Sequence, residues 1–362
     1  MQAQRADDAP ARGRGAALNA MGDPTPRYRA AMCERYGPYR EVVAVRDVPR
    51  VPLGPGQLRL RIAYAPVSRG QLVLIEGRYQ RRPALPFCAG GEVSGTVIEV
   101  GPGVEGRSVG DRVCAALDLG GYAQEAVATA STVYPIPDAL GMAEAACLPS
   151  TYGTCHAALH WRGRLKAGET VLVLGAAGGV GLATVEVARA AGARVFATGS
   201  TEAKRALALA HGADRVFPAD PDSLRDAVLA ATDGRGVDLV FDPVGGRLGE
   251  EALRCLGPEG RHLIIGFASD AVPSAAFNVL LVKNVELVGF WFGQYVGWGR
   301  VDERERYAPR MRAMVDALAA DCLAGRIRPR TDTRIPLERI VEAFDVVAMR
   351  RGTGRVLVDM GG

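Results

Sequence analysis

The amino-acid sequence predicts an α/β fold in which a doubly wound parallel sheet is inserted into a β-rich domain. The stretch Thr170–Thr184 runs from an apolar strand through a glycine turn into the start of a helix of small residues. Strands and helical segments then alternate along the chain, as in a parallel sheet. The flanking stretches instead show short β-like runs that are separated by glycine and proline.

The glycine turn has the form of a dinucleotide-binding loop. Its six central residues are Ala-Ala-Gly-Gly-Val-Gly, Ala176 to Gly181, so alanine stands at the first glycine of G-x-G-x-x-G. Glycines without a Cβ let the backbone approach a pyrophosphate, and the helix that follows directs its free N–H groups at the anion. We expect the turn residues to bind the cofactor: Ala177, Gly178, Gly179, Val180 and Gly181.

The alternating pattern continues after this turn. Its expected strands are Val195–Thr198, Val237–Phe241, His262–Ile265 and Glu286–Gly289, and its clearest helical segments are Glu202–His211 and Gly246–Leu256. Helices of this length between apolar strands indicate parallel pairing. The last of these strands is expected at an edge of the sheet, where a second copy of the chain could pair with it.

The short β-like runs on either side of the alternating stretch predict how the domains are arranged. Short β-like runs before the glycine turn, such as Leu58–Ile62, Gly95–Val100 and Asp111–Ala115, indicate a partly open barrel. After a helix over Tyr307–Ala324, the chain ends in a strand at Val356–Val358, which we expect to rejoin the barrel. The predicted division is a disordered tail at 1–26, a catalytic domain at 27–150 plus 305–362, and a dinucleotide-binding domain at 151–304.

Composition excludes several function classes. The chain has 362 residues and a net charge of +4, and it carries no basic block with interleaved aromatics, so nucleic acid is not an expected partner. No apolar run approaches the roughly 18 residues of a membrane span. The seven cysteines form no C-x-x-C motif, which indicates free thiols in a reducing compartment and a cytoplasmic location.

Six motifs together resemble those of the zinc-independent quinone oxidoreductases, the zeta-crystallin-like family of medium-chain dehydrogenases/reductases. They are Pro86–Glu92 (P-F-C-A-G-G-E), Val109–Val113 (V-G-D-R-V), Gly121–Glu125 (G-Y-A-Q-E), Ala176–Gly181, Phe241–Gly246 (F-D-P-V-G-G) and Gly352–Leu357 (G-T-G-R-V-L). The resemblance covers nearly everything from Arg29 to Val358. It implies a GroES-like catalytic domain, a Rossmann domain, hydride transfer and a homodimer.

The end of the second expected strand points to NADPH as the cofactor. NAD-binding units place an acid there for the ribose 2′-hydroxyl, but this strand ends in Thr198-Gly199-Ser200. Lys204 follows, and the resemblance implies that a lysine here binds the 2′-phosphate, with Ser200 beside it. Some relatives cover the phosphate with a tyrosine where Ala219 stands, so the preference for NADPH could be modest.

Further cofactor contacts are expected where later strands end, because ligands of such sheets bind at the carboxyl ends of the strands. Val244, Gly266, Phe267 and Ala268 follow the fourth and fifth strands of the sheet. Arg355 stands where the family has a lysine near the C-terminus, and we expect it to reach the cofactor as well.

The metal ligands of the zinc branch are missing. The positions that match its cysteine, histidine and cysteine or aspartate hold Ser68, Gly91 and Ser150, none of which is a competent zinc ligand. His156 and His160 are spaced to share one helix face, but no third ligand is evident nearby. Without a Lewis acid, the substrate must itself be a good hydride acceptor.

Tyr79, Ser68 and Gln71 are the candidate catalytic residues. The resemblance places Tyr79 at the substrate site, where it could donate to an oxyanion or stack on a ring, while Ser68 and Gln71 stand where relatives often have asparagine and aspartate. Tyr152 is a weaker candidate, and Trp291 and Tyr295 could line the site or simply pack.

Three functions fit these observations. The first is an NADPH-dependent, metal-independent reductase of quinones or α,β-unsaturated carbonyls. The second is an enoyl thioester reductase, which shares the fold and the hydride step. The third is an NADPH-binding structural or regulatory protein with little turnover, which the departures at Ser68 and Gln71 would favour.

Overall fold

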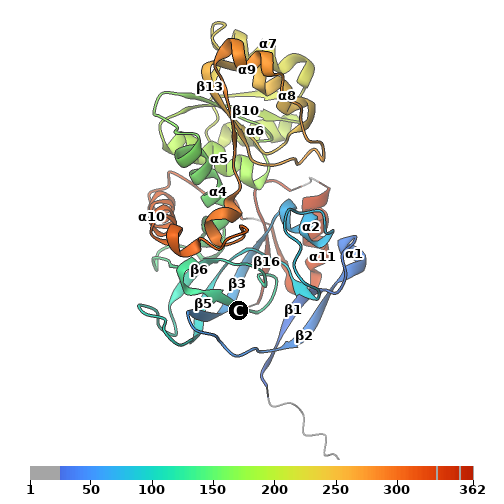
Figure 1. Cartoon of the computed structure of the whole chain (residues 1–362), viewed down its shortest axis with the longest axis vertical. Coiled ribbons are helices and arrows are strands. Elements are labelled where there is room, and N and C mark those ends of the chain that lie inside the picture. Colours follow the sequence, from blue (N-terminus) through green and yellow to red (C-terminus); the bar gives the residue numbers. More distant parts are fainter. Residues whose placement is uncertain (1–24, 332, 350–351, 362) are drawn as a thin grey trace, which may run out of the picture.

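The computed structural model describes residues 25–331, 333–349 and 352–361, which form two packed units (Figure 1). A six-stranded sheet with its helices forms the upper unit in Figure 1, and a β-rich unit lies below it. The predicted tail at 1–26 lies, apart from Thr25 and Pro26, outside the described residues.

The upper sheet is entirely parallel and doubly wound. Its strand order is β11-β10-β9-β12-β13-β14, which is the Rossmann order in which the chain starts at the centre and winds outward in both directions. The strands are β9 (Thr170–Val173), β10 (Arg194–Gly199), β11 (Arg215–Pro218), β12 (Val237–Asp242), β13 (Leu256–Ile264) and β14 (Glu286–Gly289). The predicted fold class is confirmed, and β14 lies at the expected edge.

Burial on both faces explains why β9 is continuously apolar. Val171 and Val173 pack into one hydrophobic core and Leu172 into another, because successive side chains of a strand point to opposite faces. Helices cover both faces, as parallel sheets require. They are α5 (Gly179–Ala190), α6 (Glu202–Ala210), α7 (Pro221–Ala230), α8 (Gly246–Arg254) and α9 (Phe277–Lys283).

The β-rich unit contains a seven-stranded and a three-stranded sheet. The larger has the order β15-β16-β3-β5-β6-β8 with β7 paired to β3, and the smaller has the order β2-β1-β4. The strands are β1 (Arg27–Cys33), β2 (Val43–Pro49), β3 (Gln57–Val67), β4 (Phe87–Cys88), β5 (Glu92–Val100), β6 (Arg112–Ala116), β7 (Glu125–Thr129), β8 (Val133–Pro135), β15 (Thr333–Pro336) and β16 (Val356–Asp359).

The C-terminal strand rejoins this unit as predicted. β16 pairs antiparallel with β3 and parallel with β15. The helical segments of this unit are α1 (Tyr39–Val42), α2 (Arg69–Ile75), η1 (Ala130–Thr132), α3 (Met142–Ala145), η5 (Leu337–Arg339) and α11 (Ile340–Ala348). Alternation again separates the two faces of a strand: Leu58, Leu60 and Ile62 of β3 enter the core.

One apolar core is shared by the two units. It joins Cys114 and Tyr134 of the β-rich unit to Val171 of β9 and Leu318 of α10. The connecting helical segments are η2 (Leu148–Tyr152), α4 (Gly153–Ala157), η3 (Ala158–Arg162), η4 (Phe292–Val296) and α10 (Arg304–Leu323). No helix within the described residues is long and apolar enough to cross a bilayer.

His156 of α4 and His160 of η3 form a half-buried pair. Their ring centroids lie 4.4 Å apart. Burial, followed by the neighbouring His160, lowers the pKa of His156 from 6.5 to about 4. The described residues contain no cluster of three His, Cys, Asp or Glu side chains that could hold a metal ion.

This pair should make the stability of the fold depend on pH. The folded state keeps His156 neutral down to about pH 4, whereas the unfolded chain protonates it near its ordinary value of 6.5. The unfolded state therefore binds more protons in this window, and stability falls as the pH decreases through it. We expect His156→Gln to flatten the decline of Tm between pH 6.5 and 4. An unchanged slope by calorimetry would contradict the burial of a neutral ring.

Candidate functional site

The glycine turn between β9 and α5 brings the backbone of the helix against the strand. A Cβ at residue 181 would lie 2.3 Å from the carbonyl oxygen of Gly175 and 2.8 Å from Cα of Ala176. Gly175 itself has a φ of +65°, in the left-handed region. Only glycine at position 181 therefore lets α5 start this close to the end of β9.

The outer side of the turn is open. Gly178 is exposed and stands at the N-cap of α5, and the nearest atom to a Cβ there, the Gly175 oxygen, would be 3.7 Å away. The first N–H groups of a helix lack partners within the helix and carry the positive end of its dipole. The turn thus offers backbone donors and free space, which are the requirements of a dinucleotide phosphate.

Arg355 lies directly behind the turn, immediately before β16. Its Cδ would be 2.5 Å and its Nε 2.9 Å from a Cβ on Gly179, so the guanidinium fills the space beside that glycine. Its Nη1 donates to the Val67 carbonyl at 3.1 Å. The adjoining Gly354 donates its N–H to the Ala177 carbonyl at 3.3 Å. Arg355 and Gly354 therefore hold the glycine turn from behind, and contact between Arg355 and the cofactor stays a prediction.

A buried carboxylate balances this charge. Glu92, at the start of β5, accepts from Arg355 Nη2 at 3.2 Å and from the N–H groups of Ser150 at 3.2 Å and Thr151 at 2.8 Å. The Thr151 hydroxyl also donates to this carboxylate. Burial raises the pKa of Glu92, while the Arg355 charge opposes that rise. The network therefore links β5, η2 and the residue before β16 beside the glycine turn.

The residues predicted for the 2′-phosphate lie together at the end of β10. Lys204 Nζ is 3.5 Å from Ser200 Oγ, and Thr201 caps α6 by accepting from the Lys204 N–H at 3.3 Å. Arg205, which the sequence prediction missed, donates from Nη1 to the Gly199 carbonyl at 3.2 Å. A second cation therefore lies beside Ser200, and the adjacent pair Lys-Arg was its signal in the sequence.

The loops after β12 and β13 are tied together at the same edge of the sheet. Asp242 Oδ1 accepts from the N–H groups of Val244 and Gly245, both at 2.8 Å. The Val244 side chain would lie 3.0 Å from a Cβ on Gly175, so it reaches the glycine turn.

The β13 loop then joins the β12 loop. Ala268 donates to the Pro243 carbonyl at 3.0 Å, and Gly266 donates to the Asp242 carbonyl at 3.4 Å. Phe267 lies against Gly245, where its Cδ1 would be 2.9 Å from a Cβ. The residues predicted from the fourth and fifth strands therefore lie in one connected group.

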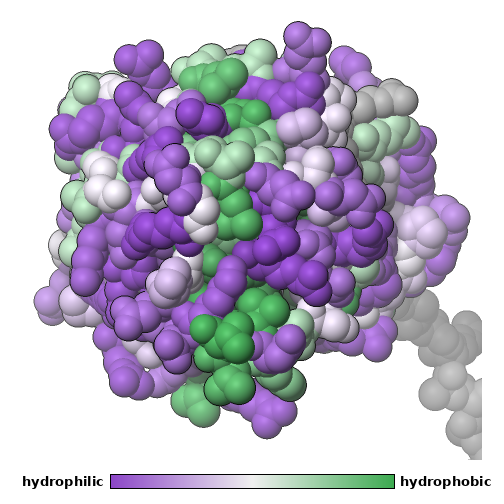
Figure 2. Space-filling view, turned by 90° about the horizontal axis from the view of Figure 1, so that it is seen from above, coloured by the Kyte–Doolittle hydropathy of each residue, from purple (hydrophilic) through white to green (hydrophobic). Residues whose placement is uncertain are grey.

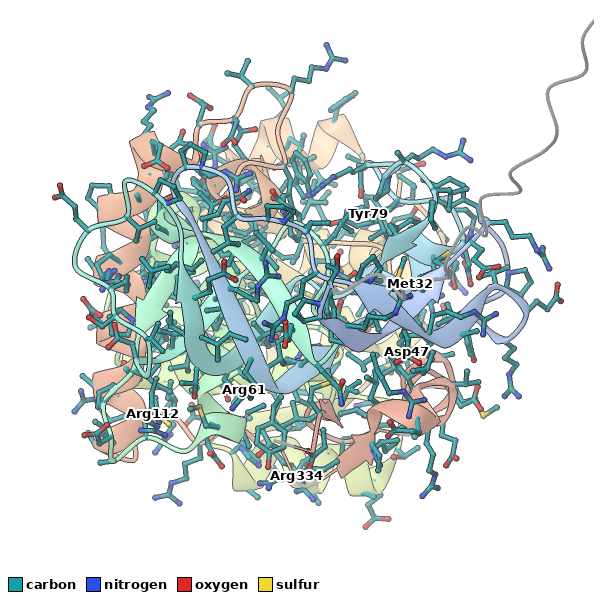
Figure 3. The ribbon with its side chains drawn as sticks, turned by 90° about the horizontal axis from the view of Figure 1, so that it is seen from below. Met32, Asp47, Arg61, Tyr79, Arg112 and Arg334 are labelled. Carbon is teal, nitrogen blue, oxygen red and sulfur yellow. The ribbon has the colours of Figure 1, made fainter. Side chains whose placement is uncertain are left out.

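The three candidate catalytic residues gather at the N-terminus of α2. Ser68 is the N-cap of this helix, and its Oγ accepts from the Gln71 N–H at 3.4 Å. A Cβ on Gly70 would lie 3.7 Å from both Ser68 Oγ and Tyr79 Cε2. In the view from below, Tyr79 lies well away from Arg112 and Arg334 (Figure 3).

Two tryptophans from the upper unit reach this group. Trp291 Nε1 donates to the Tyr79 hydroxyl at 3.3 Å. Trp298, which the sequence prediction missed, has Cη2 and Cζ2 at 3.1 and 3.3 Å from the position of a Cβ on Gly91. Arg69 of α2 also pairs with Asp270 of the β13 loop. The candidate catalytic group is thus built across both units.

Two weaker candidates do not line this group. The Tyr152 hydroxyl donates to buried Glu186 at 2.6 Å, inside the core. Tyr295 packs in an aromatic cluster with Trp161, Phe290 and Tyr307. The expected place of Tyr152 at the site is corrected, because its hydroxyl is bound inside the core. For Tyr295, packing was one of the two expected roles.

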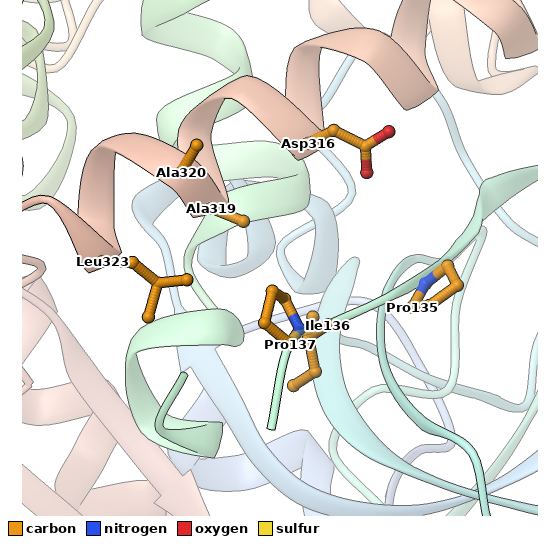
Figure 4. Close-up of a pocket in the computed structure, with 7 residues that line it drawn as sticks. All are labelled: Pro135, Ile136, Pro137, Asp316, Ala319, Ala320 and Leu323. Atoms are coloured by element: carbon orange, nitrogen blue, oxygen red, sulfur yellow. The ribbon is translucent and has the colours of Figure 1, made fainter. Parts of the chain in front are cut away.

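A cavity of about 410 Å³ lies elsewhere, between α10 and the chain after β8 (Figure 4). Its lining is mostly apolar, and none of the predicted site residues borders it. The lining residues are Pro135, Ile136, Pro137, Asp316, Ala319, Ala320 and Leu323.

Two family models match the chain at the two units. The model described as "Alcohol dehydrogenase GroES-like domain" matches residues 54–138, and the model described as "Zinc-binding dehydrogenase" matches residues 179–312. A quinone oxidoreductase-like protein 2 of Mus musculus is 35% identical over 334 residues, which cover 92% of each chain. The chain belongs to the quinone oxidoreductase family of the medium-chain dehydrogenases/reductases.

Solved structures of this family superpose over almost the whole chain. A mycobacterial protein in complex with NADPH has a TM-score of 0.83 at 30% identity, covering 92% of this chain and 99% of its own. The quinone oxidoreductase of Escherichia coli in complex with NADPH has a TM-score of 0.80 at 26% identity, with the same coverage. The predicted family is confirmed.

Gly178 and Gly181, the first and last glycines of Gly178-Gly179-Val180-Gly181, should respond differently to substitution. A Cβ at residue 181 meets backbone, whereas one at residue 178 meets open space. Overpacking of this kind costs about 1–3 kcal/mol. We therefore expect Gly181→Ala to lower the Tm and Gly178→Ala to leave it unchanged, as measured by thermal unfolding. Equal Tm values for both variants would contradict the tight contact at residue 181.

Proposed function

We propose that this protein is an NADPH-dependent, metal-independent reductase that transfers hydride to quinones or α,β-unsaturated carbonyls. The observation that carries the proposal is the arrangement around the open glycine turn. Hydrogen-bond donors for phosphate lie at α5, and two cationic side chains, Lys204 and Arg205, lie with Ser200 at the end of β10. A polar and aromatic group with an available hydroxyl lies at α2.

The end of β10 supports NADPH rather than NADH. A carboxylate there would accept from a ribose 2′-hydroxyl and repel a 2′-phosphate, whereas Ser200, Lys204 and Arg205 attract one. Ala219 stands near this position and donates its N–H to the Gly199 carbonyl at 3.2 Å. The two relatives solved with NADPH support the same cofactor.

NADPH, when bound, supplies the hydride for the reduction. The glycine turn and Val244 would hold the dinucleotide, and the joined loops after β12 and β13 would orient it. Tyr79 then serves the acceptor: its oxygen already accepts from Trp291, so its O–H is left to donate. Burial raises the pKa of Tyr79, so the side chain stays protonated at neutral pH and can supply a proton.

The residue types at the zinc-branch positions support a reaction without a metal. Zinc is held by thiolate, imidazole or carboxylate, and the matching positions carry two hydroxyls and a glycine. Ser68 caps α2, and the Ser150 N–H is bound to Glu92. These residues serve local structure rather than a tetrahedral metal site.

We keep the predicted domain division as part of the proposal, with residues 27–150 and 305–362 in the catalytic domain and 151–304 in the dinucleotide-binding domain. The seven cysteines are unpaired thiols, which supports a reducing compartment such as the cytoplasm.

We also propose a homodimer through the edge strand β14 and the adjacent helix α9. Phe277, Leu281 and Val282 of α9 are 77%, 77% and 75% exposed, which is unusual for large apolar side chains. A hydrophobic stripe crosses the end of the molecule on which α7, α8 and α9 lie (Figure 2). An edge strand beside such a surface offers both backbone pairing and apolar burial.

Charge on this helix should separate the subunits. We expect Leu281→Glu to convert a dimer into a monomer in sedimentation experiments at micromolar concentration, because a carboxylate would be buried at the interface. Val109→Glu is the matched control on an exposed apolar residue of the other unit. A wild-type monomer at these concentrations would refute the dimer.

The 2′-phosphate assignment predicts a selective loss of affinity. A charged hydrogen bond contributes about 1.5–3 kcal/mol, so Lys204→Ala should raise the Kd for NADPH roughly tenfold or more and leave the Kd for NADH nearly unchanged. Arg205→Ala should show the same selectivity, because its guanidinium lies at the end of the same strand. Calorimetric titration measures both constants, and equal weakening of the two cofactors would reject the assignment.

The proposed reaction is tested with an acceptor panel. Oxidation of NADPH is followed with benzoquinones, simple enones and crotonyl thioester. Turnover of quinones or enones supports the proposal, and a clear preference for the thioester would instead make the protein an enoyl thioester reductase. Tight NADPH binding without turnover of any acceptor would reject the reductase and leave the low-turnover binding protein.

A further inference from the structure

The absence of a side chain at Gly91 lets the Gln71 amide and the edge of the Trp298 ring approach the same point. A Cβ there would lie 3.0 Å from Gln71 Nε2 and 3.1 Å from Cη2 of Trp298. Gly91 is buried, and its φ lies outside the left-handed region, so its backbone does not demand glycine. The small residue is needed instead because an amide and an indole from different units converge on this position.

The orientation of the Gln71 amide is fixed by its surroundings. Its Oε1 accepts from the Gly90 N–H at 3.0 Å. Because the carbonyl end is bound to this donor, the NH₂ end must be the one that faces Gly91. Gln71 therefore presents a donor, and not an acceptor, toward the edge of Trp298.

The indole N–H of Trp298 is a donor without an acceptor. Its Nε1 is buried and has no hydrogen-bond partner among the described residues. Nε1 belongs to the same indole and is joined through Cε2 to the Cζ2 edge that approaches Gly91, and the Arg81 guanidinium lies 5.8 Å from the ring centroid. A buried donor left unpaired costs about 1–3 kcal/mol, which an entering acceptor oxygen would recover.

We propose that Gln71 Nε2 and Trp298 Nε1 together bind the carbonyl oxygen of the hydride acceptor beside Gly91. This inference rests on the proposed reductase function and names the group that its substrate must carry. Gly91 and the α2 N-terminus stand where the zinc branch holds its metal, so two neutral donors take the part that a Lewis acid plays there. The substrate class is a conjugated carbonyl whose oxygen gains negative charge.

The charge that these donors would meet follows from the reaction. Reduction forms a C–H bond at the acceptor carbon, and the π electrons of the conjugated system move onto the carbonyl oxygen. That oxygen then takes a proton from Tyr79 or from solvent to give the enol or hydroquinone, and the C–H bond that breaks would be that of the reduced nicotinamide, which is oxidised by two electrons. Donors placed in advance at this oxygen stabilise the charged transition state more than the neutral substrate.

Removal of one donor at a time tests the site. Trp298→Phe keeps the aromatic ring and deletes the N–H, and Gln71→Glu keeps an oxygen for Gly90 while it deletes the donor. Loss of one such donor costs on the order of 100-fold in kcat elsewhere. We expect a fall of that size in kcat for quinones or enones, with the Kd for NADPH unchanged. Trp161→Phe is the matched control, since Trp161 packs against Tyr295 and Arg310.

A second readout does not depend on turnover. 4-Nitrophenol, added to the protein with NADP⁺, mimics the oxygen that gains charge, and its absorbance reports ionisation. We expect the wild-type protein and Trp161→Phe to lower the pKa of the bound phenol below its value in water. In Trp298→Phe and Gln71→Glu this shift should be lost.

The outcomes separate this site from the proposed function. Full kcat in Trp298→Phe, or a bound phenol whose pKa does not depend on either donor, would overturn the site even if the wild type reduces quinones. Failure of the phenol to bind would overturn it as well. A wild-type protein that reduces no acceptor but shows the donor-dependent shift would reject the reductase and keep the oxygen site.

Discussion

The buried pair of Glu92 and Arg355 is the interaction on which the rest of the site depends. It joins the start of β5, the residue before β16 and the backbone of η2, three segments that are far apart in the sequence. Arg355 also fills the space behind Gly179. Two charges removed from water at the junction of the units hold one another in place, and loss of either would leave the other buried and unpaired, which costs about 3–5 kcal/mol. The pair thereby fixes the glycine turn relative to the β-rich unit.

Around this pair, the two units contribute different kinds of chemistry. The parallel sheet supplies backbone N–H groups and cations at the carboxyl ends of its strands, where ligands of such sheets bind. The β-rich unit supplies the neutral side chains of Gln71 and Tyr79, near which Trp298 and Trp291 of the upper unit lie. This combination suits the proposed reduction, in which the phosphates of the hydride donor are held while hydrogen-bond donors meet the acceptor oxygen.

Much of the fold was predictable because it depends on local pattern. The alternation of apolar strands and helices predicted the parallel sheet with β14 at its edge, the glycine motif predicted the turn, and the β-like texture of the last stretch predicted the return of β16 to the β-rich unit. Trp298 was not predicted, since a lone tryptophan between two glycines has no periodicity to interpret. Arg205 and the partners of Glu92 were missed for a related reason: their roles depend on which groups stand opposite them in space.

The sequence by itself determined the family, the order of the elements and the identity of the chemical groups, because motif spacing and apolar periodicity are properties of the chain alone. Only the tertiary structure decided which groups meet. In the tertiary structure Tyr152 lies in the core, and the Gly90 N–H orients the Gln71 amide. Trp298 contacts the position of Gly91, although more than 200 residues separate the two in the chain. Such contacts arise from the packing of two units against one another, and no local pattern encodes the position of that interface.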